Sequence, residues 1–136
     1  MYLTKEKINL DEILRGFDFG SGKNGSVIIF TGIVRGDEVK SGEFVESIFY
    51  DAYEQMAERE IEKIKNEARS KFPIDGILIR HRIGNVCVGK ISFVVVVSSA
   101  HREEGFGAIQ FIIDEVKSKV PIWKKEILSN GKTIWR

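Results

Sequence analysis

Two lysines seven residues apart, Lys117 and Lys124, are the side chains whose types and spacing most clearly suggest chemistry. Pro121 lies between them. Because proline has no N–H and disfavours helix in the residue before it, a helix that carries Lys117 must end before Lys124. A helix end that faces a short strand can direct two ammonium groups at one point. A lysine amine that is desolvated there acts as a nucleophile or as an acid–base group.

Each lysine also has a simpler explanation. A lysine such as Lys117 is favoured in the last turn of a helix by the negative end of the helix dipole. Lys124 and Lys125 are typical of a charged sheet edge that resists aggregation. Against this, Trp123 could shield the Lys124 amine from water, and Glu126, on the same strand face as Lys124, could orient it. The lysine pattern alone leaves both interpretations open.

Two other basic positions lie where anions can bind. His101 and Arg102 follow an apolar strand at the start of a helix, where free N–H groups and the helix dipole attract anions. The two cations oppose that dipole unless an anion binds between them, although Glu103 and Glu104 can also balance their charge. Arg35 ends another apolar strand. It can grip a phosphate with two hydrogen bonds, but a surface arginine at a sheet edge is the commoner explanation.

The elements that position these side chains follow from hydrophobic period and turn residues. Strands are predicted at residues 26–34, 44–53, 77–83, 91–98 and 122–128. Helices are predicted at residues 11–17, at 54–70 and from 101 to the break at 121. The segments 35–42 and 84–90 are expected to be loops. Buried stripes are expected on the two longer helices, and they include Met56 on the first and Phe106 on the second.

This irregular alternation of strands and helices predicts an α+β fold. We expect a mixed or antiparallel sheet packed by two long helices, and the 136 residues form one domain, 1–136. The glycine-rich segment 20–25 lacks the Gly-Lys-Ser/Thr ending of a phosphate-binding loop and does not lead into a helix. It is therefore not assigned that role.

Composition and charge exclude several classes of function. Hydrophobic residues make up 43% and charged residues 30%, as in ordinary soluble domains. The net charge of +1 gives no general attraction to nucleic acid or membrane. The start of the sequence has no apolar signal segment, and the single Cys87 cannot form an internal disulfide, so we expect a cytoplasmic protein. One cysteine and two histidines do not make a zinc site, and neither metal nor cofactor is expected.

Several motifs in a fixed order resemble one family. The motifs are FTGIVR at 30–35, YDAYEQMA at 50–57, HRIG at 81–84, SAHR at 99–102, DEVK at 114–117 and PIWKKE at 121–126. Phe106, shortly after the SAHR motif, is part of the same pattern. Together they span most of the chain. In this order and spacing, the sequence resembles the large, catalytic subunit of molybdopterin synthase, the MoaE family.

The resemblance implies an α/β hammerhead-like fold and a sulfurtransferase of molybdenum cofactor biosynthesis. Such an enzyme converts cyclic pyranopterin monophosphate, precursor Z, into molybdopterin. Its sulfur comes from the thiocarboxylated C-terminal glycine of a small ubiquitin-like subunit, whose tail enters a pocket of the large subunit. Two large subunits form a homodimer with a small subunit at each end, a heterotetramer. The second large subunit is expected to contribute part of the pocket.

The resemblance also assigns roles by motif. Lys117 and Lys124 match the catalytic lysines of the family, while Arg35, His101 and Arg102 match residues that bind the anionic pterin. Together these five would line one anionic-ligand pocket. Because both the tail and the pterin phosphate are anions, a local cluster of cations can collect them despite the small net charge.

Three further residues are candidates for support: Trp123, Glu126 and Arg136. Family members often continue into a basic tail that reaches a neighbouring active site, and Arg136 is the residue here that can do part of that work. Two other classes of function stay open. One is a noncatalytic module that binds a ubiquitin-like tail. The other, a phosphate- or RNA-binding domain, would need a broad basic face, which the many glutamates argue against.

Overall fold

The computed structural model describes residues 1–20 and 22–136. Ser21, in the glycine-rich segment 20–25, lies outside the described residues. The first sheet has four strands in the order β1, β5, β7 and β2. β1 is parallel to β5, and the other neighbours are antiparallel, so the sheet is mixed. The strands are β1 (Leu3–Thr4), β2 (Ser26–Ile33), β5 (Ile74–Arg82) and β7 (Ile91–Ser99).

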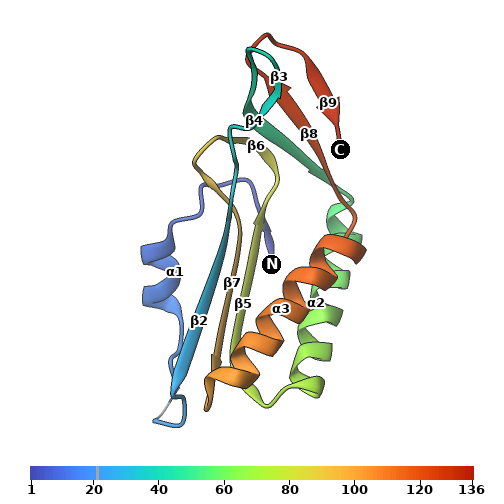
Figure 1. The fold of residues 1–136 in the computed structure, drawn as a ribbon. Helices are drawn as coiled ribbons and strands as arrows, with labels where there is room; N and C mark the ends of the chain where they lie inside the picture. The colour runs from blue at the N-terminus through green and yellow to red at the C-terminus, as the bar shows by residue number, and fades with distance from the viewer. Residues whose placement is uncertain (21) are drawn as a thin grey trace.

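Helices cover both faces of this sheet. Two helices of 18 residues each, α2 (Glu54–Lys71) and α3 (Arg102–Lys119), pack on one face, and the short α1 (Leu10–Gly16) lies against the other (Figure 1). β7 is the central strand of the sheet, as its apolar run predicts. Its segment from Val94 to Val97 is fully buried because helices lie on both sides of it.

The predicted buried stripes are wrong at two positions. Phe106 is 57% exposed and Met56 is 48% exposed. The face of α3 that packs on the sheet includes small residues, Gly105 and Ala108, which a hydrophobic pattern overlooks. A Cβ at Gly105 would come within 2.9 Å of the Ser99 hydroxyl oxygen, so glycine is needed for this close approach. The aromatic ring at 106 is thereby left on the outside.

A second sheet lies beyond the ends of α2 and α3 (Figure 1). It has five strands, in which β3, β4, β8 and β9 follow one another and β6 also pairs with β4. The strands are β3 (Glu38–Lys40), β4 (Glu43–Ala52), β6 (Gly84–Cys87), β8 (Ile122–Leu128) and β9 (Thr133–Trp135). All of their pairings are antiparallel.

Two predicted loops therefore contain strands. β3 falls within 35–42, and β6 falls within 84–90. Both are short, and β6 exists only because it pairs with β4, a contact between distant parts of the sequence. Gly84, with φ of +90°, lies where the chain passes from β5 into the second sheet. This backbone conformation favours glycine, so the HRIG motif marks the crossing between the sheets.

The junction of the two sheets brings the end of α3 close to the start of β8. α3 ends at Lys119, and β8 begins at Ile122, so the break predicted at Pro121 is confirmed. The Tyr53 N–H donates a hydrogen bond of 3.2 Å to the Pro121 carbonyl, which ties the connection to the start of α2. None of the described helices is both long enough and apolar enough to cross a membrane.

Candidate functional site

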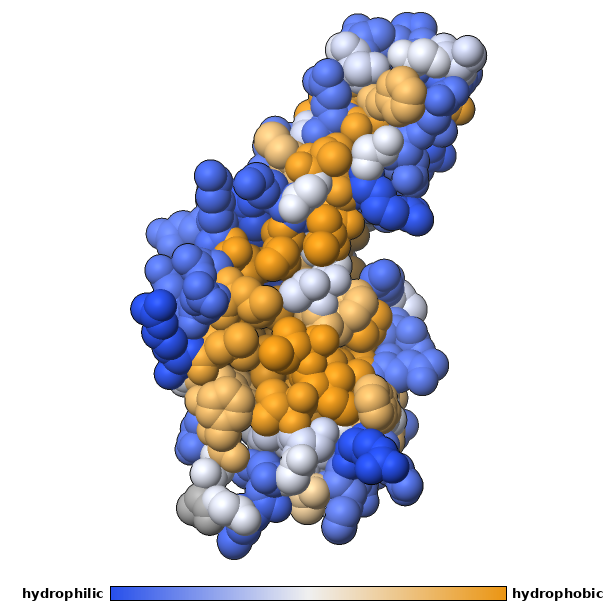
Figure 2. All heavy atoms as spheres, turned by 60° about the vertical axis from the view of Figure 1, so that its left-hand side comes forward, coloured by the Kyte–Doolittle hydropathy of each residue, from blue (hydrophilic) through white to orange (hydrophobic). Residues whose placement is uncertain are grey.

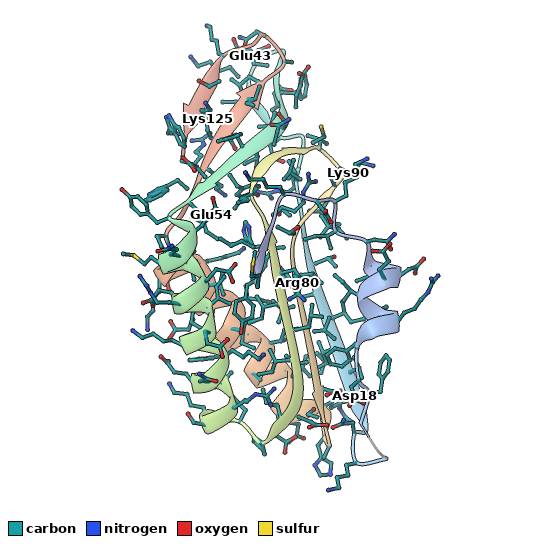
Figure 3. The ribbon with its side chains drawn as sticks, turned by 180° about the vertical axis from the view of Figure 1, so that it is seen from behind. Asp18, Glu43, Glu54, Arg80, Lys90 and Lys125 are labelled. Carbon is teal, nitrogen blue, oxygen red and sulfur yellow. The ribbon has the colours of Figure 1, made fainter. Side chains whose placement is uncertain are left out.

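A cavity of about 640 Å³ opens where the two sheets and the end of α3 meet. Lys117, from the last turn of α3, and Lys124, from β8, both line it. The fold thus brings the two predicted lysines to one cavity. The neighbouring Lys125, labelled in Figure 3, lies on the opposite face of β8. Its ammonium group lies over the rings of Phe49 and Trp135 in the second sheet.

Four basic and two acidic side chains line the cavity, a formal excess of two positive charges. Both acidic groups are paired with arginines. Arg35 lies 3.3 Å from Asp37, and Arg136 lies 2.9 Å from Glu126. Among the described residues, neither lysine has a carboxylate as an ion-pair partner. Among the described residues that line the cavity, the two lysines are therefore the cations without an ion-pair partner.

The inner wall of the cavity is aromatic. His81, on β5, packs edge to face against Tyr50, with the ring centres 5.0 Å apart, and it lies 5.3 Å from the ring of Phe93. Phe30 packs edge to face on Phe93 in turn. All four rings line the cavity. The site thus combines flat apolar surfaces with unpaired cations, which suits a planar anionic ligand.

His81 is buried and neutral in this wall. Its Nδ1 lies 2.7 Å from the carbonyl of Arg82, and since a carbonyl only accepts, Nδ1 carries the proton. The pKa of His81 is lowered from 6.5 to about 4, mainly because burial disfavours the charged ring; the hydrogen bond to Arg82 opposes this, and the positive charge of Lys117 adds to it. Alternation along a strand could not show that this ring lines the same cavity as Lys117.

The two supporting residues on β8 have different outcomes. Glu126 lies on the same face as Lys124 and lines the cavity, as predicted, but its partner is Arg136. Trp123 does not line the cavity, so the prediction that it shields Lys124 is wrong. Successive side chains of a strand point to opposite faces, and Trp123 therefore packs edge to face on Tyr53, with ring centres 4.9 Å apart.

His101 and Arg102 are not part of this cavity. They line a second hollow of about 710 Å³ at the start of α3, together with the first residues of β2. A helical rise of about 1.5 Å per residue separates Arg102 from Lys117 by roughly 22 Å. Within one chain, the structure therefore brings Arg35, Lys117 and Lys124 together and leaves His101 and Arg102 apart.

The second hollow has its own balance of charge. Glu103 and Glu104 line it with the two basic residues, and the His101 ring lies 3.8 Å from Glu104. One carboxylate oxygen of Glu104, Oε2, is buried without a hydrogen-bond partner in the described residues. In the same part of the chain, no cluster of three or more His, Cys, Asp or Glu is arranged to hold a metal ion.

Fold and cavity together define an α+β protein with a positively charged pocket at the junction of two sheets. The family model described as MoaE protein matches residues 3–119. The chain belongs to this family.

Relatives of known name agree with this assignment. The molybdopterin synthase catalytic subunit of Pyrococcus abyssi is 43% identical over 127 residues, covering 93% of this chain and 83% of the relative. The human protein of the same name is 40% identical over 133 residues, covering 98% of this chain and 68% of the relative. The crystal structure of molybdopterin synthase from Staphylococcus aureus matches with a TM-score of 0.87 and 33% identity, covering 99% of this chain and 95% of that one.

The buried His81 predicts how stability depends on pH. Between about pH 6.5 and pH 4 the unfolded chain binds a proton at His81 that the folded chain does not. Stability is therefore unaffected by this group above pH 6.5, falls as the pH drops, and has lost roughly 3 kcal/mol by pH 4. Urea denaturation of the wild type and of His81→Phe across this range measures the difference.

His81→Phe should lose the part of the pH dependence of stability that is due to His81. Identical slopes for the wild type and His81→Phe would contradict the assignment of a buried, neutral imidazole.

Proposed function

We propose that this chain is the catalytic subunit of a molybdopterin synthase, a sulfurtransferase of molybdenum cofactor biosynthesis. It converts cyclic pyranopterin monophosphate into molybdopterin with sulfur from the thiocarboxylated glycine tail of a small ubiquitin-like subunit. The observation that carries the proposal is the pair of lysines. Lys117 and Lys124 come from different elements, line one cavity, and have no carboxylate partner among the described residues.

The reaction develops negative charge at two points. One is the substrate oxygen that leaves as the tail sulfur bonds to the carbon that carried it. The other is the carbonyl oxygen of the resulting thioester when water adds to its carbon; the acyl C–S bond then breaks, the sulfur stays on the substrate as a thiolate, and the tail leaves as a carboxylate. Lys117, in the wall beside the aromatic rings, stabilises this charge and transfers protons. Lys124 holds the tail or the acyl intermediate, and Arg35 at the cavity edge binds the substrate phosphate.

Glu126 and Arg136 support the pocket as a pair. Arg136 donates from Nε to the Glu126 carboxylate, one of its terminal nitrogens lies 2.9 Å from the same oxygen, and its backbone N–H donates to the Lys124 carbonyl at 2.9 Å. These contacts fix the strand that carries Lys124. Arg136 also adds a guanidinium to the cavity, in keeping with a role for a basic C-terminal segment near the site.

His101 and Arg102 complete the pocket of a second copy. The lysine cavity and the second hollow lie at opposite ends of β2. The last residues of the strand line the lysine cavity, and its first residues line the second hollow. With eight residues, β2 is about 23 Å long, close to the separation of Arg102 and Lys117 along α3. If two copies pair their β2 strands antiparallel about a two-fold axis, each second hollow meets the lysine cavity of the other copy.

The free edge of β2 supports this pairing. Within residues 1–20 and 22–136, β2 pairs only with β7, so its other edge presents unpaired backbone groups. The strand has no charged residue and no proline to protect that edge, and Ile29 and Ile33 are 40% and 52% exposed. Figure 2, viewed from the side of β2, shows a broad hydrophobic surface across the middle of the molecule with hydrophilic groups beside it. A surface of this kind favours a protein interface.

Several finer points belong to the same proposal. The arrangement of helices and sheets is hammerhead-like, residues 1–136 act as one domain, and the protein works in the cytoplasm. The small subunit binds at the lysine cavity, so that two large and two small subunits form a heterotetramer. A noncatalytic module that binds the same tail is the alternative, and the lysine variants below distinguish it.

Single Lys117→Ala and Lys124→Ala variants should lower the rate of molybdopterin formation by roughly 100-fold or more, because each removes a charge that stabilises the transition state. The assay combines the variant with a thiocarboxylated small subunit and cyclic pyranopterin monophosphate. Both variants should fold and still bind the small subunit, as measured by circular dichroism and calorimetry.

Lys119→Ala is the matched control. Lys119 lies in the same last turn of α3 but is paired with Glu115 at 2.9 Å outside the cavity, so its loss should leave the rate unchanged. Normal molybdopterin formation by Lys117→Ala would contradict the assignment, and a wild-type chain that only binds the tail would favour the module.

Ile29→Lys tests the β2 interface. A charge buried without a partner costs several kcal/mol, so the substitution should weaken dimerisation by roughly 100-fold or more while the monomer stays folded. Sedimentation measures the dissociation. Phe44→Lys, at a side chain of similar exposure in the second sheet, should remain dimeric. A dimer of Ile29→Lys as tight as the wild type would place the interface elsewhere.

A further inference from the structure

His81 is a buried histidine in a cavity where most other charged groups are cations. The ring is 8% exposed and enters from β5. Polar groups that share the cavity with it come from every element around it. They are Tyr50 of β4, Ser92 of β7, Lys117 of α3, Lys124 and Glu126 of β8, Arg136 after β9, and Arg35 and Asp37 after β2.

The hydrogen bond to Arg82 fixes which nitrogen of His81 is available. Nδ1 carries the proton and donates it to the Arg82 carbonyl at 2.7 Å, so Nε2 keeps its lone pair. Contact with the rings of Tyr50 and Phe93 restricts the imidazole. The cavity wall therefore holds an oriented, neutral hydrogen-bond acceptor.

Lys117 is the candidate hydrogen-bond donor to Nε2 of His81. Both side chains line the same cavity, and the positive charge of Lys117 lowers the pKa of His81. Lys117 also has no carboxylate partner among the described residues. A lysine side chain has many rotamers, so an unpartnered ammonium group needs an acceptor to hold one direction.

We propose that His81 is a positioning residue, whose Nε2 accepts a hydrogen bond from the Lys117 ammonium group and directs it into the cavity. A neutral ring does this without cancelling the positive charge, whereas a carboxylate in its place would remove half of the excess of two charges. The kinetic consequence rests on the proposed sulfur transfer, but the contact itself does not.

Two His81 variants test the kinetic consequence. His81→Phe keeps an aromatic ring for Tyr50 and Phe93 but has no acceptor, so kcat should fall about 10- to 100-fold through misplacement of Lys117. The KM for the small subunit should change by less than about twofold, because binding of the tail is retained. His81→Gln restores an acceptor and should recover much of kcat. A wild-type kcat in His81→Phe, or no recovery in His81→Gln, would overturn the proposal.

NMR titration of the isolated chain tests the contact without any reaction. Lys117→Met should raise the pKa of His81 above its value of about 4, because a neighbouring positive charge is lost. Lys119→Met, which changes a residue outside the cavity, should leave the pKa of His81 unchanged. An unchanged His81 pKa in Lys117→Met would overturn the contact. If the wild type forms no molybdopterin, the proposed function fails, while a raised His81 pKa still supports the contact.

Discussion

Pro121 imposes the constraint on which the rest of the structure depends. It separates α3 from β8 within two residues, Val120 and Pro121, and the hydrogen bond from Tyr53 fixes the turn against the start of α2. The chain therefore changes from helix to strand without a flexible loop. A lysine one turn before the break and a lysine shortly after it are held by two rigid elements, and both reach one cavity.

The cavity with Lys117 and Lys124 lies at the C-terminal end of α3. The hollow with His101 and Arg102 lies at the other end of the same helix. A rigid helix cannot fold back to bring its ends together, so one chain alone cannot assemble all five basic residues named by the family motifs. A two-fold pairing of the β2 edges resolves this, because it exchanges the two ends of the molecule. In the proposed dimer, the exposed, apolar edge of β2 is the interface that joins the two parts of the site.

The sequence predicted the parts of the site that depend on local pattern. Pro121 and the spacing of Lys117 and Lys124 are local signals, and β8 follows its predicted bounds of 122–128. His81 was missed because its place in the cavity wall depends on long-range packing against Tyr50 and Phe93, which no local pattern contains. Trp123 was expected beside the Lys124 amine because the two residues are adjacent in sequence, but adjacent side chains of a strand point to opposite faces. The strands β3 and β6 were missed because long-range pairing with β4 creates them.

Mixed dimers test the central claim that one pocket is built from two copies. A differently tagged Lys117→Ala copy and Arg102→Ala copy are co-expressed, and the dimer that carries both tags is purified and assayed for molybdopterin formation. In a shared pocket, one of its two sites has both residues intact, so the account predicts about half of the wild-type activity. Activity no higher than that of the two parent variants would show that each copy uses its own Arg102, and would contradict the account.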